Sequence, residues 1–159
     1  MFKYDGLIRN LILKYKFNEK PYLYRSFIKF FEIYQKKYAQ FDFYDIIVPV
    51  PISKKRLKTR GYNQSYLIAK EISKILNIKL ENDILAKQKD NIAQSTLNKS
   101  EREENVKCVY KLVNENKVKN KKILLIDDIY TTGSTVNECS KILTNAGAEK
   151  IDIFTIAKD

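Results

Sequence analysis

The chain has 159 residues, of which 44% are hydrophobic and 12% aromatic, a composition that predicts one globular domain with a substantial core. It contains no apolar run as long as a membrane span, and its N-terminus lacks a signal-peptide core, so we expect a cytoplasmic protein without membrane insertion. Its two cysteines, Cys108 and Cys139, lie far apart in a chain without histidine, which argues against a structural zinc site and against a disulfide.

The formal net charge of +11 leaves two interpretations open. Clustered basic residues would indicate a nucleic-acid partner. Lysines spread over solvated helix faces would give the same net charge without such a partner, and most of the basic residues here are lysines. Composition alone does not decide between the two.

The first 40 residues predict two amphipathic helices. In residues 4–17, apolar side chains recur at helical spacing, at Leu7, Ile8, Leu11, Ile12 and Tyr15. Residues 22–38 follow Pro21, which suits the first turn of a helix, and direct a mostly aromatic stripe toward a core: Leu23, Phe27, Phe30, Phe31 and Tyr34. We expect residues 1–40 to form a helical addition packed on the sheet of one globular domain, residues 41–159.

Residues 45–50 (DIIVPV) predict the first strand. Pro49 cannot donate to a strand ladder, so this strand should have a free side or end there. The basic residues that follow, Lys54 to Arg60, predict a loop, and residues 61–77 predict a helix. A basic loop at the carboxyl edge of a sheet is well placed for a diphosphate, but a solvated surface loop fits the same pattern.

Residues 91–105 are polar and rich in turn formers, between a short apolar segment at 84–86 and an alternating segment at 106–113. Such a stretch is either a lid or a surface hairpin. Beyond the central motif, Gly147 predicts a helix end and residues 150–157 a last strand.

The segment 123–135 (ILLIDDIYTTGST) contains the candidate ligand-binding residues. Four apolar residues predict a buried parallel strand, and Asp127 and Asp128 stand at its end. A small hydroxyl-rich loop around Gly133 follows and opens a helix over residues 136–146, where free N–H groups and the helix dipole suit a phosphate. Carboxylates can accept hydrogen bonds from vicinal hydroxyls, so the pattern predicts a sugar-phosphate site. The alternative interpretation is a buried strand that ends in polar residues without binding a ligand. The full motif favours the sugar-phosphate site over this alternative.

This segment resembles the phosphoribosyl-diphosphate signature of type I phosphoribosyltransferases. The resemblance implies an α/β fold with a central, mostly parallel sheet, flanking helices and a lid. It assigns Asp127 and Asp128 to the ribose hydroxyls, and it implies Mg²⁺, held mainly by ligand oxygens and water with these two aspartates as candidate protein ligands. It assigns the 5′-phosphate to the loop: Thr131, Thr132, Gly133, Ser134 and Thr135.

A second resemblance covers nearly the whole chain. Residues 48–72 are similar to the competence-associated ComF family, with its Arg-Gly-aromatic-Asn-Gln signature at residues 60–64. This implies that Arg60, Gly61, Asn63 and Gln64 shape or face the cleft. It also implies that the loop after the first strand contacts the diphosphate through Ser53, Lys54, Lys55 and Arg56. Residues 93–106 match the family's lid segment, here with Gln94, Arg102 and Asn105.

The chain departs from these families at two points. It lacks the N-terminal four-cysteine zinc segment common in the ComF family. Thr131 stands where some purine transferases place an acidic base, so no catalytic base is evident. The resemblance implies binding of phosphoribosyl diphosphate with Mg²⁺ and transfer of its phosphoribosyl group to an unidentified acceptor. The alternative function is that of a single-stranded-DNA-binding accessory protein in natural transformation, built on the same fold.

Overall fold

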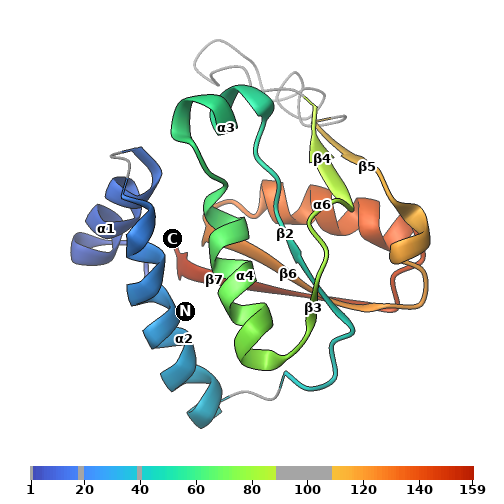
Figure 1. Ribbon diagram of the computed structural model, residues 1–159, viewed down its shortest axis with the longest axis horizontal. Coiled ribbons are helices and arrows are strands. Elements are labelled where there is room, and N and C mark those ends of the chain that lie inside the picture. Colours follow the sequence, from blue (N-terminus) through green and yellow to red (C-terminus); the bar gives the residue numbers. More distant parts are fainter. Residues whose placement is uncertain (1, 18–19, 39–40, 89–108) are drawn as a thin grey trace.

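The computed structural model describes residues 2–17, 20–38, 41–88 and 109–159. Its centre is a five-stranded sheet in which all neighbouring strands are parallel (Figure 1). In spatial order the strands are β1 (Phe2–Lys3), β7 (Lys150–Lys158), β6 (Lys122–Tyr130), β2 (Ile46–Pro49) and β3 (Lys79–Leu80). A separate antiparallel pair consists of β4 (Leu85–Lys87) and β5 (Tyr110–Leu112). The predicted α/β fold with a central parallel sheet is confirmed.

Strand β6 is the centre of the sheet because it is apolar on both faces. Leu124 and Ile126 pack into one core cluster, whereas Ile123 and Leu125 pack into the other. The strand is longer than its apolar run predicts, because its pairing with β7 continues as far as Tyr130. The two aspartates therefore lie within the strand and not after it.

Strand pairing along the two edges of β6 ends at different residues. On the β7 side pairing continues to Tyr130, but on the β2 side the last pair is Pro49 with Ile126. The prediction for Pro49 is confirmed: β2 ends there, and β3 pairs only with Ile46 and Ile47. At the carboxyl edge, β6 therefore continues to Tyr130 with its described pairing on the β7 side.

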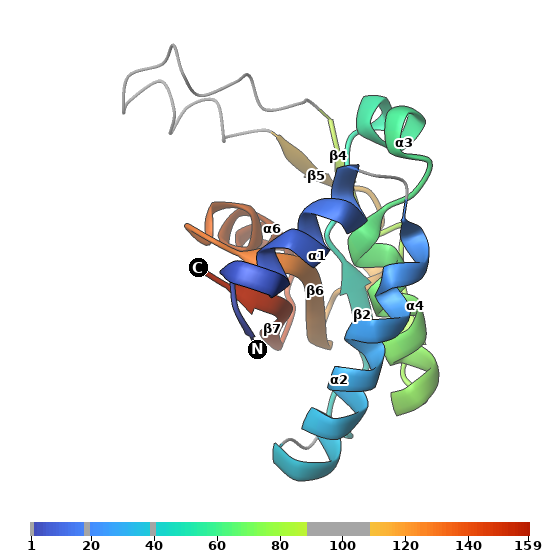
Figure 2. The same ribbon diagram turned by 90° about the vertical axis from the view of Figure 1, so that its left-hand side faces the viewer.

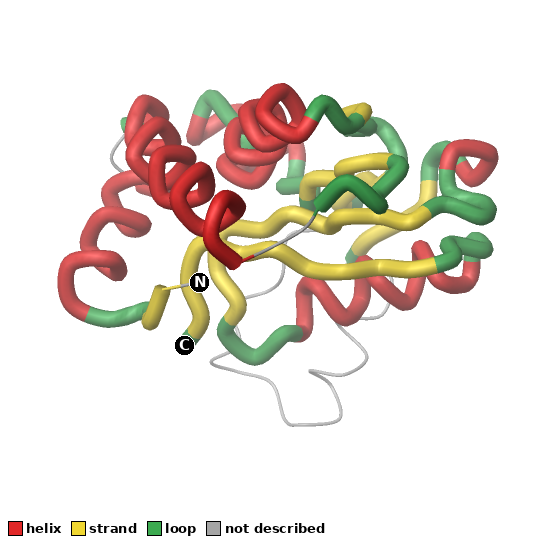
Figure 3. Tube along the Cα trace, turned by 90° about the horizontal axis from the view of Figure 1, so that it is seen from below, coloured by secondary structure: helices red, strands yellow, loops and turns green. Residues whose placement is uncertain are grey.

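Helices cover both faces of the sheet (Figures 2 and 3). On one face lie α1 (Gly6–Phe17), α2 (Tyr24–Tyr38) and α4 (Gln64–Leu76), whose buried side chains join Ile47, Leu124 and Ile126 in one cluster. On the other face α6 (Ser134–Asn145) packs with β4 and β5. Short 3₁₀ turns, η1 (Pro21–Leu23) and η3 (Glu115–Lys117), lie between these elements.

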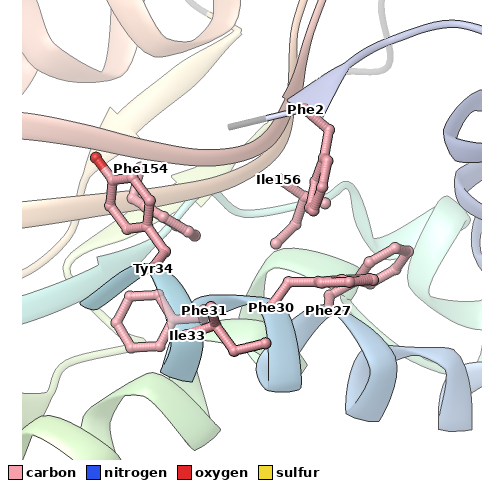
Figure 4. Close-up of a pocket in the computed structure, with 8 residues that line it drawn as sticks. All are labelled: Phe2, Phe27, Phe30, Phe31, Ile33, Tyr34, Phe154 and Ile156. Atoms are coloured by element: carbon pink, nitrogen blue, oxygen red, sulfur yellow. The ribbon is translucent and has the colours of Figure 1, made fainter. Parts of the chain in front are cut away.

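The N-terminal helices pack on the sheet, but their predicted apolar faces are only partly buried. Tyr15 and Phe31 are buried, whereas Leu7 is 72% exposed and Phe30 42% exposed. On α2, Phe30 borders a space between this helix and the β1–β7 edge of the sheet. An open apolar groove of about 260 Å³ remains between them (Figure 4), lined by Phe2, Phe27, Phe30, Phe31, Ile33, Tyr34, Phe154 and Ile156.

The prediction of a basic loop after β2 is wrong. Residues Lys54–Arg60 form a helix, α3, whose N-cap Ser53 accepts a hydrogen bond from the Arg56 N–H at 3.2 Å. Gly61, with φ of +80°, ends this helix instead of beginning the next one. Helix α4 starts only at Gln64, after its own N-cap, Asn63.

The predicted lid, with Gln94, Arg102 and Asn105, lies outside the described residues. The β4–β5 pair flanks that stretch, with Lys87 opposite Tyr110 as the last described pair. Within the described parts of the chain, no helix combines the length and apolar character needed to cross a membrane.

Candidate functional site

The loop between β6 and α6 surrounds a small cavity of about 30 Å³. Gly133 has φ of +76° and directs the chain into α6, which begins at Ser134. The hydroxyls of Thr132 and Ser134 lie 2.8 Å apart. Free N–H groups at a helix start, together with these hydroxyls, form a set of donors suited to an anion. The cavity is lined by Asp127, Ile129, Tyr130, Thr131, Thr132, Gly133, Ser134, Thr135 and Val136.

Tyr130 explains why the loop needs glycine at position 133. A Cβ atom on Gly133 would lie 2.5 Å from the Tyr130 hydroxyl oxygen, closer than any van der Waals contact permits. The aromatic ring therefore packs against the loop backbone. We did not predict a role for Tyr130, although its position between the aspartates and the loop could have suggested one.

Asp127 is buried and held by two donors. Its Oδ1 accepts one hydrogen bond from the Ser65 hydroxyl and one from the Asp128 N–H, both at 2.9 Å. Burial, with a smaller contribution from the neighbouring Asp128 charge, raises the pKa of the Asp127 carboxyl. Ser65 comes from the first turn of α4 and was not predicted as a site residue, because only the fold brings it to β6.

Asp128 is also buried but turns toward α1. Its Oδ2 lies 2.8 Å from Nζ of Lys16, with the Asp128 side chain 4% exposed and that of Lys16 19% exposed. Adjacent strand residues point to opposite faces, so the two carboxylates meet different surroundings. Asp127 lines the loop cavity, and Asp128 anchors the last turn of α1. The motif alone suggested two equivalent carboxylates.

The Arg-Gly-Tyr-Asn-Gln signature joins helices. Tyr15 of α1 donates its hydroxyl to the Gln64 carbonyl at 2.8 Å, and the Tyr62 hydroxyl donates to the Tyr15 carbonyl. Arg60 Nη1 donates to Oε1 of Gln64. Asn63 caps α4 and donates from Nδ2 to the Val50 carbonyl at 3.0 Å. These contacts fix α1, α3 and α4 around the carboxyl end of β2.

The residues expected to contact a diphosphate separate into two groups. Ser53 is buried as the N-cap of α3, and Lys54 and Lys55 are exposed on that helix. Arg56 lines a cavity of about 290 Å³ between α1 and α3, here named the α1–α3 pocket. The complete lining of the α1–α3 pocket is Lys16, Phe17, Arg56, Thr59 and Arg60.

The oxygen donors near the carboxyl end of β6 are the carboxylates of Asp127 and Asp128. Among the residues that the structure describes, no three His, Cys, Asp or Glu side chains form a group that could hold a metal ion. A Mg²⁺ ion binds hard oxygen ligands and retains several waters, so one or two carboxylates next to a phosphate-bearing ligand suit it. The donor set therefore fits Mg²⁺ only as an ion shared with a ligand.

Together, the fold and the loop define a class: an α/β protein with a phosphoribosyltransferase-type sheet. A family model described as "Phosphoribosyl transferase domain" matches residues 63–159. A solved structure of glutamine phosphoribosylpyrophosphate amidotransferase from B. subtilis has a TM-score of 0.56 and 17% identity, covering 84% of this chain and 26% of that one. Similarity at this level shows the fold. The chain belongs to the phosphoribosyl transferase domain family.

The curated relatives include competence proteins and a DNA utilization protein. Competence protein F of Haemophilus influenzae is 32% identical over 93% of this chain and 66% of its own length. Competence protein ComFC of Streptococcus pneumoniae is 33% identical over 99% and 66%. The DNA utilization protein YhgH of Escherichia coli is 30% identical over 72% and 49%. The ComF resemblance is confirmed, and the chain spans about two thirds of the length of the first two relatives.

Proposed function

We propose that this protein binds phosphoribosyl diphosphate together with Mg²⁺ and transfers the phosphoribosyl group to an acceptor, releasing diphosphate. The observation that carries the proposal is the cavity that Asp127 shares with the hydroxyl-rich loop at the start of α6. On one side of this small space lies the Asp127 carboxylate, which can accept hydrogen bonds from sugar hydroxyls. On the other side lie the N–H and hydroxyl donors of the loop, which suit a phosphate.

The residues take separate roles. Residues 131–135 hold the 5′-phosphate, and the Asp127 carboxylate accepts a hydrogen bond from a ribose hydroxyl. Asp128 accepts a hydrogen bond from the second ribose hydroxyl. It does so through Oδ1, because Lys16 pairs with Oδ2, or through Oδ2 after Lys16 moves away. The exposed side chains of Lys54, Lys55 and Arg56 attract the diphosphate. Ser53, buried as a helix cap, supports α3.

In the reaction, the bond between ribose C1 and the diphosphate oxygen breaks, and its electron pair leaves with the diphosphate. The acceptor's lone pair forms the new bond to C1. Positioning and charge stabilisation carry such a reaction. Mg²⁺, when bound, would neutralise charge on the diphosphate, and Asp127 and Asp128 would be its candidate protein ligands. We further propose a cytoplasmic location, where phosphoribosyl diphosphate is available.

A second candidate function is single-stranded DNA binding during DNA uptake. It is supported by the names of the relatives, competence proteins and a DNA utilization protein. The basic helix α3 supports it too, because phosphate contacts by Lys and Arg supply most of the non-specific affinity for DNA. Both functions can use the same surface, since α3 stands beside the proposed diphosphate position.

Calorimetric titration with phosphoribosyl diphosphate, with and without Mg²⁺, tests the main proposal. We expect saturable binding that Mg²⁺ strengthens and that the double substitution Asp127→Asn/Asp128→Asn abolishes while the protein remains folded. The control is Asp83→Asn, which changes an exposed carboxylate that does not line the loop cavity. Undiminished binding by the double variant would remove the aspartates from the site. No binding by the folded wild-type protein would refute the proposed function.

A further inference from the structure

Lys16 places a positive charge against one of the two motif aspartates. Its Nζ lies 2.8 Å from Oδ2 of Asp128, and the Asp128 side chain is only 4% exposed. Water screens a charge pair poorly where both partners are largely buried, so the attraction between these two groups exceeds that of a surface ion pair. The fold itself therefore supplies a cation to a carboxylate that we assign to the ligand site.

The last turn of α1 keeps Lys16 in this position. The buried Tyr15 donates its hydroxyl to the Gln64 carbonyl at 2.8 Å, and the Tyr62 hydroxyl donates to the Tyr15 carbonyl. Both contacts attach the turn that carries Lys16 to the segment from which α4 begins. A partner held by the chain itself acts at a high effective concentration, so a free cation must compete with it for the carboxylate.

One carboxylate oxygen cannot serve Lys16 and a divalent ion together. Mg²⁺ binds carboxylate oxygens directly, and an ion on Oδ2 of Asp128 would lie beside the Lys16 ammonium group, where two positive charges repel. Among the described residues, no three His, Cys, Asp or Glu side chains form a group that could hold a metal ion. The two aspartates therefore gain no third acidic ligand from that part of the chain to offset the repulsion.

Lys16 also has a second position available to it. Its side chain lines the α1–α3 pocket, whose volume of about 290 Å³ offers room for the ammonium group away from Asp128. Arg60 lines the same pocket, so its positive charge disfavours that second position. The ion pair with Asp128 is therefore the favoured arrangement, and the pocket is the alternative.

We propose that Lys16 is a tethered competitor of Mg²⁺ for Asp128, so that α1 controls whether this aspartate takes part in metal binding. While the ion pair is formed, Oδ2 of Asp128 is closed to a metal ion. When Lys16 turns into the α1–α3 pocket, that oxygen becomes available. As regulation of the ligand site the inference rests on the proposed function, whereas the competition for Oδ2 itself does not.

Removing the competitor should make the protein respond to Mg²⁺. Lys16→Met leaves a buried carboxylate without its cation, and Mg²⁺ alone should then replace the missing charge. The measurement is thermal unfolding in excess MgCl₂, compared with NaCl at the same ionic strength. We expect Mg²⁺ to raise the Tm of Lys16→Met by about 3 °C or more, and that of the wild-type protein by less than about 1 °C.

Three further variants show whether the response belongs to Asp128. Lys14→Met removes an exposed lysine of the same helix and should behave like wild type. Lys16→Arg keeps the positive charge and should also remain unresponsive. The double variant Lys16→Met/Asp128→Asn lacks the carboxylate, so the response should disappear. If Lys16→Met does not fold, Lys16→Gln takes its place, because it removes the charge but keeps a polar side chain.

The inference is overturned if the folded Lys16→Met variant does not respond to Mg²⁺, if Lys14→Met responds as strongly, or if the response persists in the double variant. A wild-type protein that responds as strongly as Lys16→Met would overturn it as well, because the lysine would then exclude nothing. None of these measurements uses phosphoribosyl diphosphate. If phosphoribosyl diphosphate does not bind, the proposed function fails and the competition is still decided, whereas binding of phosphoribosyl diphosphate without a Mg²⁺ response in Lys16→Met refutes only the competition.

Discussion

Lys16 and Asp128 form an ion pair of 2.8 Å between the last turn of α1 and the central strand of the sheet. Both side chains are largely buried, so each charge depends on the other for its compensation. The pair ties the N-terminal helix to the strand that carries the proposed ribose site. It also determines which oxygen of Asp128 a ligand can reach.

Replacing Lys16 by Met should lower the free energy of unfolding by about 3 kcal/mol, because it leaves a buried carboxylate without its partner. Urea unfolding of Lys16→Met, Asp128→Asn and the double variant measures the coupling between them. The double variant should be more stable than Lys16→Met alone. If the two effects simply add, the ion pair has no energetic role. Lys14→Met, on an exposed side of the same helix, is the matched control.

Asp127 should make stability depend on pH. Its pKa in the folded protein is raised to about 7, mainly by burial, so the native state holds a proton that the unfolded chain releases at lower pH. The stabilisation from this proton is complete below the ordinary carboxyl pKa and is lost as pH rises toward neutrality. Relative to Asp127→Asn, the wild-type protein should therefore lose unfolding free energy between pH 4 and about 7. Chemical denaturation of both proteins across this range is the measurement, and a constant difference would contradict it.

Gly133→Ala should disrupt the loop between β6 and α6. The added methyl group meets the Tyr130 hydroxyl, and a non-glycine residue at positive φ costs about 1 kcal/mol or more. We expect lower stability and weaker binding of phosphoribosyl diphosphate. Adding Tyr130→Ala should remove the loss of stability that comes from the steric clash, but not the loss that comes from the positive φ of the backbone. Full recovery in the double variant would mean that backbone strain is negligible, and no recovery would mean that the ring does not confine the loop.

Asn63→Ala should cost about 1–2 kcal/mol of stability, because it removes the N-cap of α4. It also removes the hydrogen bond to the Val50 carbonyl. Asn63→Ser keeps a capping oxygen and loses only that second bond, so it should be the milder change. Thermal unfolding of both variants separates the two contributions. If both variants unfold like wild type and only ligand binding changes, Asn63 acts on the ligand and not on the fold.

The sheet and the loop could be predicted because their signals are local. An uninterrupted apolar run defines β6, and small residues around Gly133 followed by helical spacing define the turn into α6. Helix α3 was missed since only Leu57 is apolar among its seven residues, so no helical periodicity marks it. Its start depends on the Ser53 cap, which is a weaker signal than the charge that follows.

The partners of the aspartates were not predictable, because they depend on tertiary packing. Ser65 reaches Asp127 from the first turn of α4, and Lys16 reaches Asp128 from α1. Both come from far along the chain, with no pattern that links them to β6. The exposure of Phe30 and Tyr34 has a similar cause: helical spacing identifies an apolar face but not how much of it the rest of the fold covers.

One peptide unit connects the two cavities. The Asp128 N–H donates to Asp127 Oδ1, while the Asp128 side chain holds Lys16 in the wall of the α1–α3 pocket. A ligand that displaces or protonates either carboxylate therefore changes the electrostatic field in the other cavity. The adjacent aspartates thus link the charge of the loop cavity to the ion pair that positions Lys16.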